Sequence, residues 1–440
     1  MNKITDHILC KVEKPARYVG GELNEIIKNP EEVDIRFAFC FPDVYEVGMS
    51  HLGTRILYHT INERKDTYCE RVFAPWPDME EQLRKNNISL CTLETKTPLK
   101  EFDILGFTLQ YEMSYTNILN MLDMSGVTIR AEERGEDEPL VMAGGPCAYN
   151  PEPLVGIVDF FEIGEGEEMM DDVLEVYAKY KKGKWDKKAF LREISKIGGI
   201  YVPSLYDVEY NEDGTIKSFK PKYDDVPAVV KKRIINNFDR VSFPENMIVP
   251  YTEIVHDRIV LETFRGCTNG CRFCQAGMIY RPVREKSKET LVKQARNMLK
   301  STGYQEVSLS SLSTCDYSDI EGLIHDLMEE HEKDKVAIAL PSIRVDAFSV
   351  DLIKEIQKVK KTGLTFAPEA GSQRMRDIIN KGLTEERILE ATRNAFESGW
   401  NKIKLYFIIG LPYETLEDCA GIGDLAGKMA DEYFALPKRS

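Results

Sequence analysis

The most informative stretch of this chain is Phe264-Arg265-Gly266-Cys267-Thr268-Asn269-Gly270-Cys271-Arg272-Phe273-Cys274, which places three cysteines within eight residues. Their spacing is Cys-x3-Cys-x2-Cys, and the next cysteine along the chain is Cys315. Three closely spaced thiolates can bind three irons of a cubane cluster, whereas electron-transfer ferredoxins normally use four cysteines. The spacing therefore predicts a [4Fe–4S] cluster, bound by Cys267, Cys271 and Cys274, whose fourth iron is open to a small-molecule ligand.

The residues around the cysteines suit a loop that wraps a cluster. Gly266 and the Asn269-Gly270 pair let the backbone turn sharply, because glycine and asparagine tolerate positive φ. Arg265 adds positive charge near a cluster that is net negative. Phe273 lies between two ligands, where its ring could shield the cluster or pack on a bound base.

A zinc site and incidental thiols are the alternatives for this triplet. A structural zinc site needs four ligands, commonly two Cys-x2-Cys pairs, and the nearest histidine in sequence, His256, precedes the loop. A disulfide framework is not expected in a large chain without a secretory signal. The cluster is the favoured interpretation.

The composition is that of a soluble chain from a reducing compartment. Its 440 residues predict two or three domains, and 42% hydrophobic residues are enough for real cores. No signal-peptide stretch follows Met1, and no apolar run is as long as a membrane span. We expect a cytoplasmic protein that makes no membrane contact. The net charge of −15 argues against a general polyanion binder.

The spacing, with an aromatic residue before the last cysteine, resembles the signature of the radical S-adenosylmethionine (SAM) enzymes. The resemblance implies that the amine and carboxylate of SAM chelate the open iron. It also implies that one electron, supplied by an external donor, cleaves the sulfonium to methionine and a 5′-deoxyadenosyl radical.

Strands and helices alternate after the cysteine loop, which implies βαβ units and a parallel sheet. The predicted strands are 258–265, 306–312, 336–340, 364–367 and 402–410, and the predicted helices are 286–301, 317–332, 349–361, 384–398 and 416–432. Ligands of such sheets bind at the carboxyl ends of the strands, where the cysteine loop also lies. The radical SAM barrel usually has six βα units, so five predict a partial barrel truncated after the fifth.

Further cofactor contacts are expected at the ends of these strands. Ser342 and Arg344 end the third strand with groups that suit ribose hydroxyls and a carboxylate. Glu369 and Ser372 end the fourth, in a turn that resembles the Glu-x-Gly-Ser turn of radical enzymes related to methylthiotransferases. The alternative for Arg344 and Glu369 is a surface ion pair.

Two other strand ends complete the expected cofactor site. Ile409 and Gly410 end the fifth strand and look like the motif on the adenine side of the family, although such a pair is often only a strand terminus. The second strand departs from the family's Gly-Gly-Glu, which contacts the methionyl amine. It carries Ser310-Ser311-Leu312-Ser313, with Asp316 beyond, and serine hydroxyls such as that of Ser310 could replace those contacts.

The N-terminal half predicts a second α/β unit. Its predicted strands are 33–41, 103–109, 140–146 and 158–163, and its predicted helices are 46–62, 114–123 and one that opens at 164–167. The Gly144-Gly145-Pro146 turn and the Gly164-Glu165-Gly166-Glu167 turn resemble the Rossmann-like cobalamin-binding domain that precedes many radical barrels.

Cobalamin is therefore a candidate second cofactor, and the alternative is a domain that keeps the fold and has lost the ligand. The Asp-x-His-x-x-Gly motif of the usual lower-ligand histidine is absent. His51 could bind cobalt, but a histidine near a helix N-terminus is the more common case. Gly-x-Gly-x-x-Gly is also absent, so dinucleotide binding ranks lower.

The segment between the halves is irregular and locally basic. Six lysines lie within 179–188, and a hairpin is predicted over 205–220 because Asp213-Gly214 favours a tight turn. A solvated helix end is the simpler interpretation of the lysines, and an RNA contact is the alternative.

We thus expect an α/β chain of three parts. A Rossmann-like, cobalamin-binding-like domain covers 1–183, a hairpin and linker cover 184–250, and a partial radical SAM barrel covers 251–440. The expected function is reductive cleavage of SAM for methyl or sulfur transfer to an unknown substrate, with RNA as a candidate. A redox-sensing or scaffolding iron–sulfur protein without turnover is the alternative. The substrate and the oligomeric state cannot be predicted from the sequence.

Overall fold

The structure is a computed structural model that describes residues 4–340 and 364–436. The chain divides into two compact units, Met1–Asp257 (unit 1) and Arg258–Ser440 (unit 2). Both units are α/β, as the sequence predicts. The segment 184–250, predicted as a hairpin and linker, lies within unit 1.

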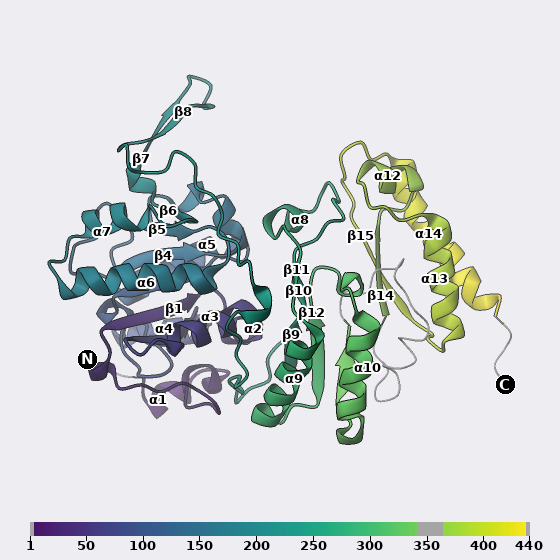
Figure 1. The fold of residues 1–440 in the computed structure, drawn as a ribbon, viewed down its shortest axis with the longest axis horizontal. Helices are drawn as coiled ribbons and strands as arrows, with labels where there is room; N and C mark the ends of the chain where they lie inside the picture. Colours follow the sequence, from purple (N-terminus) through teal and green to yellow (C-terminus); the bar gives the residue numbers. More distant parts are fainter. Residues whose placement is uncertain (1–3, 341–363, 437–440) are drawn as a thin grey trace. The chain divides into compact units, whose positions relative to one another are not determined.

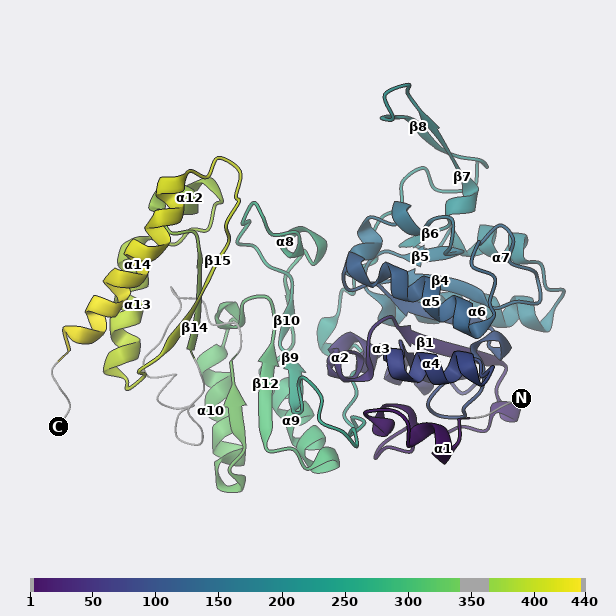
Figure 2. The ribbon, with the colours of Figure 1, turned by 180° about the vertical axis from the view of Figure 1, so that it is seen from behind.

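Unit 1 is built on a six-stranded sheet of order β2-β1-β3-β4-β5-β6 (Figures 1 and 2). The strands are β1 Ile35–Phe41, β2 Thr67–Phe73, β3 Ile104–Thr108, β4 Leu140–Gly144, β5 Phe160–Glu162 and β6 Ile200–Tyr201. The first five are parallel and β6 runs antiparallel to β5. The strand order reverses between β1 and β3, which makes that point the topological switch of a doubly wound sheet.

Helices cover both faces of this sheet. They are α1 Asp6–Leu9, α2 Tyr45–Ser50, α3 Leu52–Glu63, α4 Pro77–Lys85, α5 Tyr115–Ser125, α6 Gly166–Lys182 and α7 Lys187–Ile194. On one face α3 packs against α6, and on the other α4 is joined to α5 through Arg84, which pairs with Asp123 (Figures 1 and 2).

Several features of unit 1 differ from the sequence-based prediction: β2, β6, α1, α4 and α7 were not predicted, and one predicted helix is divided. The predicted helix 46–62 is two helices, because the chain is extended at His51, whose side chain caps α3. Strand β2 was not predicted, since Glu70 and Arg71 interrupt its apolar pattern. Both charged side chains are nonetheless buried, because Arg36 pairs with Glu70 and Arg71 pairs with Glu22 and Glu94.

The hairpin predicted over 205–220 is confirmed. It consists of β7 Tyr206–Tyr210 and β8 Ile216–Pro221, which are antiparallel. The turn uses Gly214 at φ +82°, and the Asp213 carboxylate accepts hydrogen bonds from the amide and hydroxyl of Thr215.

Unit 2 contains two parallel sheets among its described residues. One has the order β13-β12-β9, and the other pairs β14 with β15. The strands are β9 Ile259–Glu262, β10 Phe264–Arg265, β11 Arg284–Glu285, β12 Glu306–Ser310, β13 Ala337–Ala339, β14 Leu364–Glu369 and β15 Ile403–Phe407. The predicted strands 258–265, 306–312, 336–340, 364–367 and 402–410 are thereby confirmed.

Helices follow the strands as the alternation requires. They are α8 Ala276–Ile279, α9 Lys288–Thr302, α10 Ile320–His331, α12 Gln373–Ile378, α13 Glu385–Glu397 and α14 Leu416–Phe434. Of these, α8 and α12 were not predicted, and the predicted helix 349–361 lies outside the described residues. Phe366 of β14 packs with Ile388 of α13 and Leu425 of α14 to form a core. Within the described ranges, no helix has both the length and the apolar character that a bilayer crossing needs.

Candidate functional site

The cysteine loop begins where the first strand of unit 2 ends. After β9 and Thr263, strand β10 pairs antiparallel with β11, so residues 266–283 close into a loop at the carboxyl side of β9. Gly266 opens the loop at φ +99°, and a Cβ there would lie 2.6 Å from the Pro282 carbonyl oxygen. Only glycine fits this position, as the turn chemistry of the sequence indicates.

All three cysteines of the loop are free thiols and partly buried. The amide of Cys274 donates to the carbonyl of Cys271 at 3.0 Å, which fixes the turn between the second and third thiol. No three His, Cys, Asp or Glu side chains of the described part of the chain converge on a single metal ion. A cubane does not require this, because each of its thiolates binds a different iron.

One side of the loop is held by Asn269. Its side-chain amide donates to the Sγ of Cys267 at 3.3 Å and to Oδ2 of Asp316 at 3.1 Å. Asp316 follows β12, so the contact ties the loop to the next strand of the sheet.

The other side of the loop is held by the end of α12. The amide of Arg272 donates to the carbonyl of Ile379 at 2.9 Å, and its guanidinium donates to the carbonyl of Ile378. Asn380 donates from its side chain to the Gly270 carbonyl at 3.0 Å. The segment between the first two cysteines is thus fixed from two directions.

Arg265 has an acidic partner of its own. Its Nε donates to Glu262 Oε1 at 2.8 Å, and a second nitrogen reaches Oε2 at 3.0 Å. Burial would raise the pKa of Glu262, but the charges of Arg265 and Lys286 outweigh it and hold this pKa below its usual value. The positive charge expected from Arg265 near a cluster is therefore largely balanced by Glu262.

Phe273 is part of the cysteine loop, and Ser310 ends β12, the strand beside β9. Phe273 is 39% exposed, so its ring is available for a ligand. Ser310 ends β12, and its carbonyl accepts from the amide of Thr263 at 3.0 Å, directly before the loop. Ser313, three residues on, has a buried hydroxyl with no hydrogen-bond partner.

Glu369 ends β14 in a conformation that is uncommon for glutamate. Its φ is +67°, in the left-handed region, and its carboxylate accepts from Lys381 Nζ at 3.0 Å. The Ile408 amide donates to its carbonyl at 2.8 Å, which joins the ends of β14 and β15. Left-handed residues other than glycine and asparagine store strain and are concentrated at functional sites.

Ser372 starts α12. Its hydroxyl accepts from the amide of Met375 and donates to the carboxylate of Asp418. Hydrogen bonds from Arg374 and then from Ser372 hold the pKa of Asp418 well below its usual range. The two hydrogen bonds of the Ser372 hydroxyl thus stabilise the turn after β14.

The end of β15 carries Ile409 and Gly410. The Ile409 side chain is 72% exposed, and Gly410 is left-handed at φ +91°. The Gly410 amide donates to Glu414 Oε2 at 2.6 Å, so this carboxylate shapes the turn. Ser342 and Arg344, the remaining predicted residues, lie outside the described residues.

Unit 1 has a cavity at its topological switch. A space of about 340 Å³ opens beside Phe41, at the end of β1, and Thr108, at the end of β3. Ligands of doubly wound sheets bind at this place. His51 also lines the cavity, and its Nδ1 accepts from the amide of Thr54 at 3.1 Å. The neutral ring then carries its proton on Nε2, which favours the helix-cap role over cobalt coordination.

A buried carboxyl that the sequence does not single out ends β5. Glu162 is 4% exposed, and its Oε1 has no hydrogen-bond partner. Burial, reinforced by the charge of Glu167, raises the pKa of Glu162 to about 8. It lies abreast of Gly144 and Thr108 in the sheet, so it belongs to the same carboxyl edge as the cavity.

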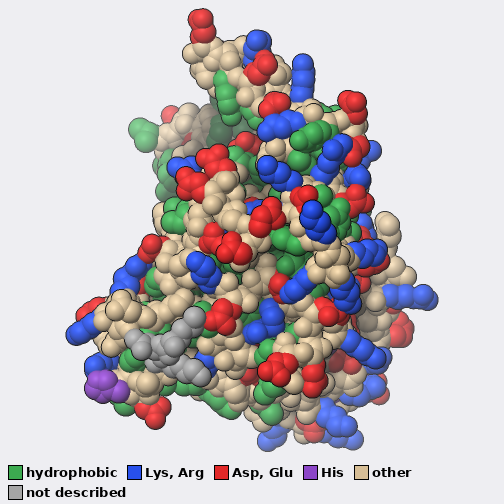
Figure 3. Space-filling model, turned by 90° about the vertical axis from the view of Figure 1, so that its left-hand side faces the viewer, with side chains coloured by type: hydrophobic (Ala, Val, Ile, Leu, Met, Phe, Trp, Pro, Cys, Tyr) green, Lys and Arg blue, Asp and Glu red, His purple; other side chains and the backbone are tan. Residues whose placement is uncertain are grey.

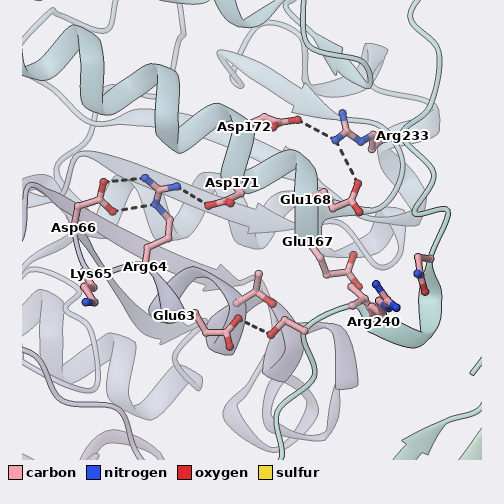
Figure 4. Close-up of a pocket in the computed structure, with 14 residues that line it drawn as sticks. Glu63, Arg64, Lys65, Asp66, Glu167, Glu168, Asp171, Asp172, Arg233 and Arg240 are labelled. Atoms are coloured by element: carbon pink, nitrogen blue, oxygen red, sulfur yellow. Dashed lines mark hydrogen bonds and ion pairs between the residues drawn. The ribbon is translucent and has the colours of Figure 1, made fainter. Parts of the chain in front are cut away.

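A second hollow of unit 1 is a groove of about 860 Å³ between α3, α6 and the segment 233–242. Its charges largely satisfy one another. Figure 4 shows Arg64 between Asp66 and Asp171, and Arg233 between Glu168 and Asp172. The groove therefore offers little unbalanced charge to a ligand.

The basic run of 179–188 is similarly compensated. Four of its six lysines pair with carboxylates: Lys179 with Glu175, Lys181 with Asp103, Lys182 with Asp34 and Lys187 with Asp159. In Figure 3, which faces the side of the molecule that is on the left in Figure 1, blue and red side chains are intermixed. These pairs favour a solvated helix end over a basic stripe.

Family models match both halves of the chain. Residues 53–203 match the N-terminal region of radical SAM proteins, and residues 261–426, which include the cysteine loop, match the radical SAM superfamily. The chain belongs to the radical SAM superfamily. This membership places it in a class of enzymes that use a [4Fe–4S] cluster and SAM.

Two curated relatives cover most of the chain. An uncharacterized protein, MJ0966, of Methanocaldococcus jannaschii is 28% identical over 398 residues, which are 90% of this chain and 74% of that protein. An uncharacterized methyltransferase, PH0819, of Pyrococcus horikoshii is 23% identical over 344 residues, which are 76% of this chain and 66% of that protein.

Two solved structures share the fold. The cobalamin-dependent SAM radical enzyme OxsB, with aqua-cobalamin and SAM bound, has a TM-score of 0.59 and 16% identity and covers 89% of this chain. The match takes in 51% of OxsB, so the chain spans about half its length. The radical SAM methyltransferase TsrM of Kitasatospora setae, with cobalamin and a [4Fe–4S] cluster bound, has a TM-score of 0.56 and 13% identity, over 90% of this chain and 74% of TsrM.

Proposed function

We propose that Cys267, Cys271 and Cys274 hold a [4Fe–4S] cluster and that the protein cleaves SAM reductively. The observation that carries this proposal is the closed loop of three partly buried thiols at the carboxyl side of a parallel sheet. A side-chain amide directed at the Sγ of Cys267 also suits a thiolate ligand.

The chemistry of such a site is a one-electron cleavage. A cluster held by Cys267, Cys271 and Cys274 and reduced by an external donor would supply the one electron needed to cleave SAM to methionine and a 5′-deoxyadenosyl radical. Because the loop offers three thiols, one of the four irons would have no cysteine ligand from the loop and would be open to SAM. The chain also supplies the binding groups around the cofactor.

Those groups are proposed to lie at the strand ends. Glu369, which is left-handed and pairs with Lys381 through its carboxylate, is proposed to accept hydrogen bonds from the cofactor. Phe273, which is partly exposed next to Cys274 in the sequence, is proposed to pack on the cofactor. Ser310 and Asp316 are proposed to bind polar atoms of the cofactor. These assignments rest on the carboxyl edge that parallel strands share.

Five other sequence-predicted residues complete the proposed cofactor site. Ser372 shapes the turn that presents Glu369, and the backbone of Ile409 and Gly410 is proposed to meet the adenine. Ser342 and Arg344 remain predictions for the ribose and the carboxylate.

Cobalamin is proposed as a second cofactor of unit 1. The proposal is supported by the cavity at the β1–β3 switch and by the shared fold of OxsB and TsrM, whose structures contain cobalamin. Optical titration of the protein with hydroxocobalamin tests it, and failure to retain the corrinoid through gel filtration would remove cobalamin from the account.

The reaction is proposed to be radical-initiated methyl or sulfur transfer. RNA remains the substrate candidate that the sequence suggests. Incubation with bulk RNA and SAM carrying a labelled methyl group tests it directly. Label that stays out of the RNA in the presence of active enzyme would exclude methylation of the RNA tested.

The decisive test of the proposed function is release of 5′-deoxyadenosine. Anaerobically reconstituted protein should form it from SAM and dithionite, whereas the Cys271→Ala variant should not. A protein that carries a full cluster but forms no 5′-deoxyadenosine would instead support a redox-sensing or scaffolding role.

A further inference from the structure

Asn269 makes two hydrogen bonds that its position in sequence does not explain. Its Nδ2 lies 3.3 Å from the Sγ of Cys267 and 3.1 Å from Oδ2 of Asp316. An amide nitrogen has two donor hydrogens, and these two contacts use both. One hydrogen therefore reaches a predicted cluster ligand, and the other reaches a carboxylate that comes from a different strand end.

The backbone of Asp316 is held in a short turn, although its side chain is exposed. It ends the short helix Thr314–Asp316, and its amide donates to the Ser313 carbonyl at 2.9 Å. Thr314 in the same turn is fully buried, and its hydroxyl bonds to that of Ser311 at 3.2 Å. The carboxylate can therefore orient the amide of Asn269.

The backbone around Asn269 is also held. Asn380 donates to the Gly270 carbonyl at 3.0 Å, and the Ile379 carbonyl accepts from the amide of Arg272 at 2.9 Å. With the next residues anchored in this way, the backbone holds the side chain of Asn269 next to Cys267. A contact that is maintained in this way can influence the chemistry of the thiolate.

Hydrogen bonds to cluster sulfurs are one of the factors that set the reduction potential of an iron–sulfur centre. A donor stabilises the more negative, reduced state more than the oxidised state, because its N–H dipole points its positive end at the sulfur. An N–H donor to a cysteinyl sulfur therefore raises the potential.

We propose that Asn269 is a positioning residue that raises the reduction potential of the cluster through its hydrogen bond to Cys267, and that Asp316 holds it in place. The inference rests on the proposed function, since it needs a cluster on the three cysteines. It adds a determinant of how readily that cluster accepts its electron.

The test is a potentiometric titration of the reconstituted protein with dithionite, followed by electron paramagnetic resonance of the one-electron-reduced cluster. Asn269→Leu removes the donor at similar size. Asn401→Leu, at an exposed position of the same unit, is the matched control. The Asn269→Leu variant should load iron as the unaltered protein does, and its potential should be more negative than that of the control.

The role of Asp316 is measured by a double-mutant cycle. In the Asn269→Leu background, Asp316→Ala removes only a nearby negative charge, so the potential should rise. In the unaltered background the same change also releases the Asn269 amide, so the rise should be smaller or reversed. Equal shifts in the two backgrounds would overturn the role assigned to Asp316.

The outcomes separate this inference from the proposed function. Iron-free unaltered protein would refute the cluster itself. If the Asn269→Leu variant carries a normal cluster and its reduction potential equals that of the Asn401→Leu control, only the hydrogen-bond inference is refuted. If Asn269→Leu fails to take up iron, Asn269→Gln, which keeps the amide, decides the matter. Iron uptake by Asn269→Gln supports the contact, and its failure overturns the inference.

Discussion

The side-chain amide of Asn380 donates to the backbone carbonyl of Gly270 at 3.0 Å, across 110 residues of sequence. Asn380 follows α12 at φ +54°, a conformation that asparagine tolerates better than most residues. Because α12 begins directly after the Glu369 turn, this bond links the strand end of β14 to the cysteine loop. The positions of the thiols and of the proposed cofactor contacts are thereby coupled.

Replacing Asn380 by glycine should loosen the cysteine loop without unfolding unit 2. Glycine keeps the left-handed backbone, so the change removes mainly the hydrogen bond, worth about 1 kcal/mol. We expect faster loss of iron from the reconstituted protein to a ferrous chelator. Asn401→Gly, at an exposed site in the same unit, is the control. Equal rates of iron loss in the two variants would show that the bond does not support the loop.

Gly266→Ala should destabilise the loop more severely. The residue would be strained at φ +99°, and its Cβ would meet the backbone of Pro282 and Tyr280. Strain of this kind costs about 1–3 kcal/mol before the steric clash is added. Gly303→Ala is a matched control, because Gly303 is also left-handed, at φ +74°, but has open space around it. The iron content and the midpoint temperature of thermal unfolding should fall further for Gly266→Ala than for Gly303→Ala. Equal falls in the two variants would refute the steric explanation.

Glu162 should make the stability of unit 1 depend on pH. Its pKa is raised to about 8 in the folded protein, whereas a glutamate of the unfolded chain titrates near 4.3. Between these values the folded state binds more protons than the unfolded state. The free energy of unfolding therefore falls as pH rises through this window, by up to about 1.4 kcal/mol per pH unit.

Glu162→Gln removes this titration while keeping the side chain's size. Urea unfolding at pH 6, 7 and 8 should show a shallower loss of stability with rising pH in the variant. Burial also raises the pKa of Glu94, to about 7, but this group titrates in both proteins and cancels in the difference. Parallel pH profiles for the two proteins would show that Glu162 is not a buried acid.

Arg71 should be essential to unit 1. It is buried between Glu22 and Glu94, at 2.6 Å and 2.7 Å. Arg71→Met leaves both carboxylates buried without their counter-charge, which should cost about 3–5 kcal/mol. Arg192→Met breaks an exposed pair with Asp225 and should cost at most about 1 kcal/mol. Chemical denaturation that gave similar losses for both would contradict the assignment of Arg71 to the core.

The alternation of strands and helices was predictable because most strands are short apolar runs between glycines or prolines. Strand β2 was not predictable, because the residues that pair with Glu70 and Arg71 lie elsewhere in the chain. These partners are Arg36, Glu22 and Glu94. The interruption at His51 was missed for a related reason. A histidine that caps a helix leaves no distinct mark on the apolar periodicity.

The candidate site divides in the same way. The cysteines and the glycine at the loop entrance follow from local spacing and turn chemistry. The contacts of Asn269 with Asp316 and of Asn380 with Gly270 span 47 and 110 residues, so no local pattern reveals them. The engagement of the Ser372 hydroxyl by Asp418 likewise depends on a helix far along the chain.

The central claim is that the cluster on Cys267, Cys271 and Cys274 leaves one iron open to SAM. Electron paramagnetic resonance of the dithionite-reduced protein, recorded with and without SAM, tests it most directly. We predict that SAM changes the spectrum of the cluster, because its amine and carboxylate bind the open iron. A cluster whose spectrum is the same at saturating SAM would contradict the account.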